Sequence, residues 1–128
     1  MLLCSLLQTS MHAACFNFTM LMREVETHLL ALQNGEMGFT ALFIGLDRFK
    51  VINEGTNHNV GDRILELVGE RLVTAFPNEV VARYGGDSFV VLHQKSAKPI
   101  VEAAADRVID EFRRPFKVAD RDLVVGAS

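Results

Sequence analysis

Two aspartates stand where a carboxylate could do chemistry, and both lie beside predicted strands. Asp87 follows a pair of glycines in the stretch RYGGDSFVVLH, and Asp47 follows the apolar run GFTALFIGL. A hairpin by itself does not need an acid at its tip, so the rest of the chain has to decide what this carboxylate is for. The alternative interpretation is structural, because aspartate is a common turn residue that bonds to its own backbone. These two stretches alone leave both interpretations open.

The residues around Asp87 predict a β-hairpin. Residues 82–84 lead out of one apolar run and residues 89–92 start another, with Gly85 and Gly86 between them. A tight reversal there predicts positive φ at the glycines, a conformation that glycine adopts at low cost. The run at residues 38–46 has strand length and is continuously apolar, which predicts a central strand covered on both faces.

Three amphipathic helices are predicted around these strands, because apolar residues recur at spacings of three and four. They span residues 17–32, 60–76 and 99–112. A strand from residue 116, a polar turn at residues 119–122 and a last strand follow. The whole predicts a sheet with helices packed against it, at least partly antiparallel because of the hairpin. The order of elements leaves several topologies open.

Composition indicates a single domain, since the chain has 128 residues and 49% of them are apolar. A net charge of −3 with acids and bases mixed offers no basic face for nucleic acid or for a membrane surface. Cys4 and Cys15 match neither a disulfide framework nor a metal-ligand spacing, which favours a reduced, cytoplasmic compartment. No stretch approaches the roughly 20 apolar residues of a membrane span. Residues 1–16 lack the basic start of a signal peptide and are interpreted as a linker or the tail of an upstream segment.

Three motifs carry a resemblance to a known family. LDRFKVIN, NHNVGD and RYGGDSF occur in this order and spacing, and together they resemble the GGDEF family of bacterial diguanylate cyclases. The likeness extends over residues 17–128. It implies an α/β (α+β) fold, the palm of nucleotidyl cyclases, with a ferredoxin-like and mostly antiparallel sheet flanked by helices. In this family the signature lies on a β-hairpin, and the enzymes condense two GTP molecules into cyclic di-GMP.

The resemblance also implies site residues. Guanine would be bound by Asn53 and Asp62, an amide and a carboxylate that satisfy the donor and acceptor groups of the base. Taken alone, Asn53 reads equally well as a loop cap and Asp62 as an acid in the first turn of a helix. The implied metal ligands are Asp47 and Asp87, and Asp87 would also be the catalytic residue of an active enzyme. The remaining implied nucleotide contacts are Phe49, Lys50, Gly85 and Gly86.

The chain departs from the family pattern at two acids. Gly45 stands in place of the acid that precedes Asp-x-Phe-Lys, and Ser88 stands in place of the second acid of the signature. Two-metal nucleotidyl transfer needs carboxylates from two strands, so we expect weak metal binding. Asp47 is displaced from position 45 by roughly 6 to 7 Å along a strand and cannot simply substitute. The structural alternative for Asp87 makes it a turn residue with Arg83 as its surface partner.

The chain also lacks parts of the family's inhibitory motif and of its amino-terminal signature. Residues 76–79 read Phe-Pro-Asn-Glu where many members carry an inhibitory Arg-x-x-Asp, so the arginine that would grip a phosphate is absent. Only Asn17 remains of the amino-terminal signature. The chain ends at VVGAS, before the family's last helix and strand, so residues 17–128 are expected to form a GGDEF-like domain without these elements.

These departures predict a degenerate, catalytically inactive GGDEF domain that serves as a regulatory or GTP-binding module of a cyclic di-GMP signalling protein. The expected ligand is GTP, with Mg²⁺ if a nucleotide is bound. The expected partners are a sensor upstream, an EAL phosphodiesterase domain downstream and a second copy in a homodimer, without contact to nucleic acid or membrane. Two alternatives stay open: an active cyclase in which Asp47 and Asp87 rebuild a metal site, and a protein-interaction fold with no nucleotide.

Overall fold

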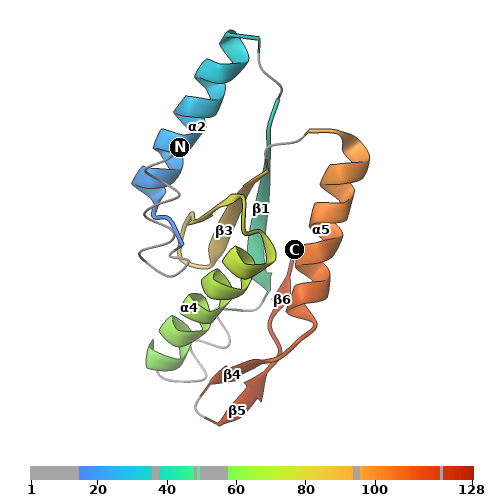
Figure 1. Cartoon of the computed structure of the whole chain (residues 1–128). Coiled ribbons are helices and arrows are strands. Elements are labelled where there is room, and N and C mark those ends of the chain that lie inside the picture. The colour runs from blue at the N-terminus through green and yellow to red at the C-terminus, as the bar shows by residue number, and fades with distance from the viewer. Residues whose placement is uncertain (1–14, 36–37, 48, 50–57, 94–95, 119) are drawn as a thin grey trace.

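The described part of the chain forms an antiparallel sheet with helices on both of its faces (Figure 1). This computed structural model describes residues 15–35, 38–47, 49, 58–93, 96–118 and 120–128. In chain order the elements are α2 (Phe18–Gln33), β1 (Thr40–Asp47), α4 (His58–Ala75), β2 (Val80–Arg83), β3 (Ser88–His93), α5 (Lys98–Phe112), β4 (Phe116–Val118), β5 (Arg121–Leu123) and β6 (Gly126–Ala127).

The main sheet has the strand order β2-β3-β1-β6, and each neighbouring pair is antiparallel. Strands β2 and β3 form the predicted hairpin, with Arg83 opposite Phe89. Strand β1 pairs with β3 from Thr40 opposite His93 to Gly45 opposite Ser88. Strands β4 and β5 form a separate two-stranded sheet. The predicted antiparallel sheet with flanking helices is therefore confirmed, and the fold supplies the strand order that the sequence left open.

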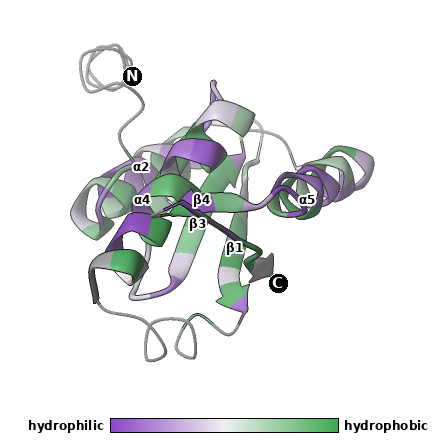
Figure 2. Cartoon of the chain, turned by 90° about the horizontal axis from the view of Figure 1, so that it is seen from below, coloured by the Kyte–Doolittle hydropathy of each residue, from purple (hydrophilic) through white to green (hydrophobic). Residues whose placement is uncertain are grey.

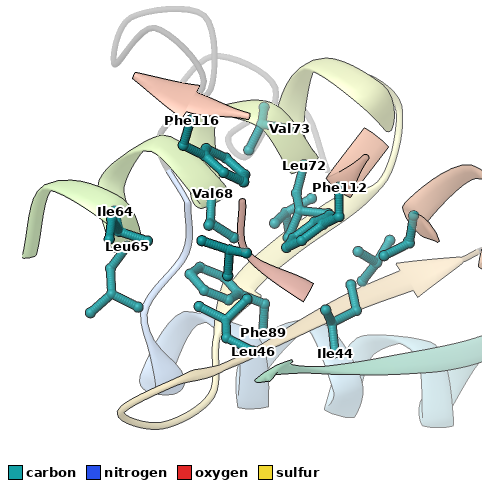
Figure 3. Close-up of a cluster of buried hydrophobic side chains, with 14 of the residues drawn as sticks. Ile44, Leu46, Ile64, Leu65, Val68, Leu72, Val73, Phe89, Phe112 and Phe116 are labelled. Atoms are coloured by element: carbon teal, nitrogen blue, oxygen red, sulfur yellow. The ribbon is translucent and has the colours of Figure 1, made fainter. Parts of the chain in front are cut away.

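Side chains that alternate along β3 divide the core into two clusters, one on each face of the sheet. Phe89 and Val91 face the larger cluster, which α4, α5 and β4 complete (Figure 3). Val90 and Leu92 face the smaller cluster, which Leu21 of α2 completes. Strands β1 and β3 are accordingly mainly hydrophobic in Figure 2, whereas the helices change between hydrophobic and hydrophilic residues along their length.

The helix ends follow local rules. Asn17 is the N-cap of α2, and its Oδ1 accepts a hydrogen bond from the Met20 amide at 2.9 Å. The helix stops before Gly35, whose φ of 84° lies in the left-handed region that glycine adopts easily. Pro99 lies in the first turn of α5, where its missing N–H costs nothing. None of the described helices is long and apolar enough to cross a membrane.

Three predictions about these elements are wrong in detail. Strand β1 is not covered on both faces, because the Phe43 side chain is 63% exposed. Helix α4 begins at His58, so Asp62 lies beyond its first turn. The turn between β4 and β5 is shorter than predicted, since Arg121 already pairs with Val118 and Asp120 adopts a φ of 64°. Aspartate tolerates that conformation better than most residues, which explains how so short a turn closes.

The packed part of the chain includes Phe16, a residue that the sequence placed at the end of the linker. Its side chain is 3% exposed, and its backbone forms an isolated parallel bridge with Ala82 at the outer edge of β2. The Phe16 amide donates to the Val81 carbonyl at 2.8 Å. Residues 1–14 of the predicted linker lie outside the described range.

Candidate nucleotide site

Gly45 and Ser88, the two departures from the family pattern, are direct partners across β1 and β3. The Gly45 amide and carbonyl are both bonded to Ser128, at 2.8 and 3.0 Å, on the opposite side of β1. Gly45 and Ser88 are therefore a non-hydrogen-bonded pair, the kind in which facing side chains come closest. Two acids at these positions would converge on one ion, whereas a hydrogen atom and a neutral hydroxyl supply no charge.

Crowding does not force a glycine at position 45. A Cβ built on Gly45 would meet only the Ser128 carbonyl oxygen, at an ordinary contact distance of 3.8 Å. The backbone there lies outside the left-handed region, so a side chain would be tolerated in conformation as well. The missing acid at position 45 is thus a change in chemistry without a structural requirement behind it.

Asp47 is exposed, but its carboxylate is engaged with β6. Its Oδ1 accepts a hydrogen bond from the Ser128 hydroxyl. A Cβ on Gly126 would lie 3.0 Å from Asp47 Oδ2, so a larger residue there would push the carboxylate slightly away from this position. Asp47 and Gly45 lie on the same face of β1, yet Asp47 acts here as a contact to the neighbouring strand.

Asp87 presents its carboxylate at the surface of the hairpin tip. Its backbone carbonyl accepts a hydrogen bond from the Leu46 amide at 3.0 Å, which ties the tip to β1. Its Oδ1 accepts a long hydrogen bond of 3.4 Å from the Ser88 hydroxyl. The hairpin therefore places Asp87 next to the pair formed by Gly45 and Ser88, with one carboxylate in the group, and its role as a metal ligand stays a prediction.

The two glycines of the hairpin are not in positive φ, so that prediction is wrong. A Cβ on Gly85 or Gly86 would meet nothing within 4 Å, which leaves open space on the surface of the turn. Arg83 does not pair with Asp87 as the structural alternative predicted. Its Nε and an Nη donate to the carbonyls of Gly85 and Gly86, each at 3.1 Å.

The other predicted nucleotide contacts differ in their surroundings: one is exposed, one is buried and two lie outside the described residues. Asp62 is exposed in the first half of α4. Phe49 is 8% exposed and belongs to the larger core cluster, so its ring contributes packing, and a role in nucleotide binding stays a prediction. Asn53 and Lys50 lie outside the described residues. Among the described residues, no group of three histidine, cysteine or acidic side chains is arranged to hold a metal ion.

The stretch at the family's inhibitory position borders a hollow of about 390 Å³. Phe76 is buried in the core, and Glu79 Oε1 lies 3.1 Å from Nδ1 of His93. Arg107 reaches the edge of this hollow from α5, where it donates to the Ala75 carbonyl at 3.0 Å. Phe76 stands at the position of the family's arginine and Glu79 at that of its aspartate, so the loss of a phosphate grip stays a prediction.

Sequence reasoning missed three residues that shape the site: Arg83 as a partner of the glycine carbonyls, and Gly126 and Ser128 as partners of Asp47. An arginine two residues ahead of a Gly-Gly pair is a signal that could have indicated the first contact. The hydrogen bond between Ser128 and Asp47 joins residues 81 positions apart, so no local signal was available for it.

The fold and the site together define an α+β domain of the nucleotidyl-cyclase type, with a Gly-Gly-Asp hairpin beside the end of a central strand. The family profile described as "Diguanylate cyclase, GGDEF domain" matches residues 14–128. The chain belongs to the GGDEF family.

The chain is also similar to individual proteins and to a solved structure. The chain is 36% identical over 113 residues to the signaling protein YkoW of Bacillus subtilis, covering 83% of this chain and 14% of that protein. It is 40% identical over 82 residues to the diguanylate cyclase DgcP of Escherichia coli, covering 63% of this chain and 24% of that protein. It thus spans less than a quarter of the length of these relatives. The crystal structure of the GGDEF domain of PA1120 from Pseudomonas aeruginosa superposes with a TM-score of 0.81 at 26% identity, over 90% of this chain and 73% of that one.

Proposed function

We propose that this chain is a GGDEF domain that does not condense GTP and that acts as a regulatory or GTP-binding module of a cyclic di-GMP signalling protein. The observation that carries the proposal is the pairing of Gly45 with Ser88 across β1 and β3. The family resemblance assigns an acid to each of these two positions. Both residues are neutral here, and they face each other across the two strands.

The residues present do not fit the magnesium ions of a cyclase. Mg²⁺ needs hard oxygen ligands, and two-metal phosphate chemistry needs negative charge from both strands. Of the two remaining acids, Asp47 is engaged by the Ser128 hydroxyl and fitted against Gly126, and Asp87 is a single exposed carboxylate.

Recognition of the base needs no metal, which is why GTP binding is retained in the proposal. Asp62 lies exposed on α4, where its carboxylate can accept from the N–H groups of guanine, with Asn53 as the partner that the family motif supplies. The open space beside Gly85 and Gly86 supports an approach of the phosphates to the hairpin.

A regulatory role in a larger protein is supported by the relatives. The chain is 34% identical over 92 residues to the cyclic di-GMP phosphodiesterase NbdA of P. aeruginosa, covering 71% of this chain and 12% of that protein. It is also 35% identical to an EAL/GGDEF domain protein from M. capsulatus, covering 70% of this chain and 59% of that one, with a TM-score of 0.65. We therefore propose an EAL domain as a neighbour of this module in its full-length protein.

Two measurements test the proposal. Incubation with GTP and Mg²⁺, followed by mass spectrometry, should yield no cyclic di-GMP. Isothermal titration should show GTP binding that changes less than about threefold when Mg²⁺ is removed, and that is weakened about tenfold in Asp62→Ala, the loss of one charged hydrogen bond. Product formation, or affinity that depends strongly on Mg²⁺, would show that the metal site works.

A further inference from the structure

We propose that Arg83 is a positioning residue that orients two backbone N–H groups of the hairpin toward the phosphates of a bound nucleotide. This inference rests on the proposed binding of GTP. It begins with the two hydrogen bonds by which the Arg83 guanidinium holds the carbonyls of Gly85 and Gly86, each at 3.1 Å. One planar fork thus fixes two consecutive peptide groups on the same side of the turn.

The two hydrogen bonds from Arg83 also set the direction of two backbone N–H groups, because the peptide group is planar. No peptide bond among the described residues is cis, and in a planar trans peptide the N–H points opposite to the C=O. The Gly85 carbonyl shares its peptide plane with the Gly86 N–H, and the Gly86 carbonyl shares its plane with the Asp87 N–H. Because Arg83 draws both carbonyls to itself, both N–H groups are turned to the other side.

No described backbone carbonyl accepts a hydrogen bond from these two N–H groups, so they can donate to a ligand. The Ser88 carbonyl accepts from the Tyr84 amide at 2.9 Å and from the Gly85 amide at 3.4 Å, whereas no described backbone carbonyl accepts from Gly86 or Asp87. A Cβ at either glycine would meet nothing within 4 Å, so the space at the turn is open. Adjacent backbone N–H groups that point to the same side can bind an anion, and phosphate oxygens are strong acceptors.

The arrangement also explains why the turn needs Arg83. Gly85 and Gly86 do not use the left-handed conformation that usually fixes a tight turn, so the shape of this turn depends on its hydrogen bonds, including the two from Arg83. The guanidinium adds a constraint on the carbonyl side of the turn. Since it sits on the carbonyl side, Arg83 acts through the backbone and is not required to touch the phosphates.

The test compares Arg83→Ala with Arg113→Ala, which removes the same charge from an exposed ion pair at the end of α5. In the free protein, ¹⁵N relaxation should give order parameters for Gly86 and Asp87 that fall from about 0.8 to below about 0.6 in Arg83→Ala only. Binding of GTP and of inorganic triphosphate should weaken about tenfold in the same variant. Arg83→Lys should recover only part of both effects, because one ammonium cannot hold two carbonyls in a fork.

Several outcomes of these measurements would overturn the role of Arg83. Unchanged order parameters in Arg83→Ala, or lower order parameters with unchanged binding, would overturn the role of Arg83, and so would full recovery in Arg83→Lys. If the wild type binds triphosphate but not GTP, the proposed binding of GTP is overturned, and the effect of Arg83→Ala on triphosphate binding still decides the role of Arg83. If the wild type binds neither, the proposed binding of GTP and the role of Arg83 are both overturned.

Discussion

Under the proposed function, a metal site is lost at Gly45 and Ser88, and this loss needs no change in the backbone of the two strands. The two residues are paired across β1 and β3, and a side chain at position 45 has room. A deletion of charge at two facing positions leaves the hydrogen bonds of the strands in place, since these are made by the backbone. The chemistry of a site therefore depends on a few side chains, whereas the fold does not depend on those side chains.

Restoring both acids should therefore restore metal binding. In the Gly45→Asp/Ser88→Glu double variant, we expect affinity for Mg²⁺ or Mn²⁺ in the presence of GTP to rise at least about tenfold, measured by titration calorimetry. Without metal, the facing negative charges should lower the melting temperature, and added Mg²⁺ should raise it again. The matched control is Gly45→Asn/Ser88→Gln, which has the same shape without charge. Equal metal binding by the control and the acidic variant would contradict this explanation.

Cys15 provides a second prediction for a single residue. Burial raises the pKa of the Cys15 thiol to about 11, against a smaller opposing effect of Arg83. Below pH 9 the thiol is protonated in both the folded and the unfolded chain, and between pH 9 and 11 only the unfolded chain loses the proton. In Cys4→Ser, which leaves one thiol, the midpoint of urea unfolding should fall over this pH range, and additional Cys15→Ala should remove the fall. Alkylation of Cys15 by iodoacetamide at pH 8 should be about 100-fold slower in the folded protein than in urea.

At the scale of elements, long-range contacts join helix and strand ends that local rules do not connect. Arg71 of α4 donates to the carbonyls of Glu111, Arg114 and Pro115, at 3.0, 2.6 and 2.9 Å, where α5 ends and β4 begins. Its guanidinium also stacks on Phe116, 3.6 Å from the ring centroid. One side chain thus satisfies the end of α5 and fixes it against α4.

Arg71→Ala should lower the free energy of unfolding by about 2 kcal/mol, because several carbonyls lose a charged donor at once. Arg71→Lys should recover little of this, since an ammonium cannot replace a planar fork and its stacking. The control on the same helix is Arg63→Ala, which removes an exposed pair with Glu66 and should cost less than about 0.5 kcal/mol. Chemical denaturation would measure all three, and equal effects of Arg71→Ala and Arg63→Ala would show that the contacts of Arg71 do not stabilise the fold.

For the whole molecule, stability comes from the larger core cluster, where α4, α5 and β4 close over one face of the sheet (Figure 3). Phe89 lies at its centre and is 1% exposed, whereas Phe43 on the neighbouring strand is 63% exposed. The two phenylalanines have the same chemistry, so the difference between them measures mainly burial, apart from the edge contact of the Phe43 ring with Tyr84.

Phe89→Ala should cost about 3 to 5 kcal/mol, a large part of the stability of a domain of this size, while Phe43→Ala should change it by less than about 0.5 kcal/mol. Urea unfolding of both variants is the measurement. A cost for Phe43→Ala close to that for Phe89→Ala would place the core on the other face of β1 and contradict the described packing.

The sequence by itself determined the elements, the family and the identity of the departures. Helical spacing and the Gly-Gly-Asp hairpin are local signals, which neighbouring residues carry by themselves. Only the tertiary structure decided that Gly45 faces Ser88, that Asp47 is engaged by Ser128 and that Arg83 holds the glycine carbonyls. Strand register and the direction of a side chain depend on packing between distant segments, and a sequence read locally does not carry that information.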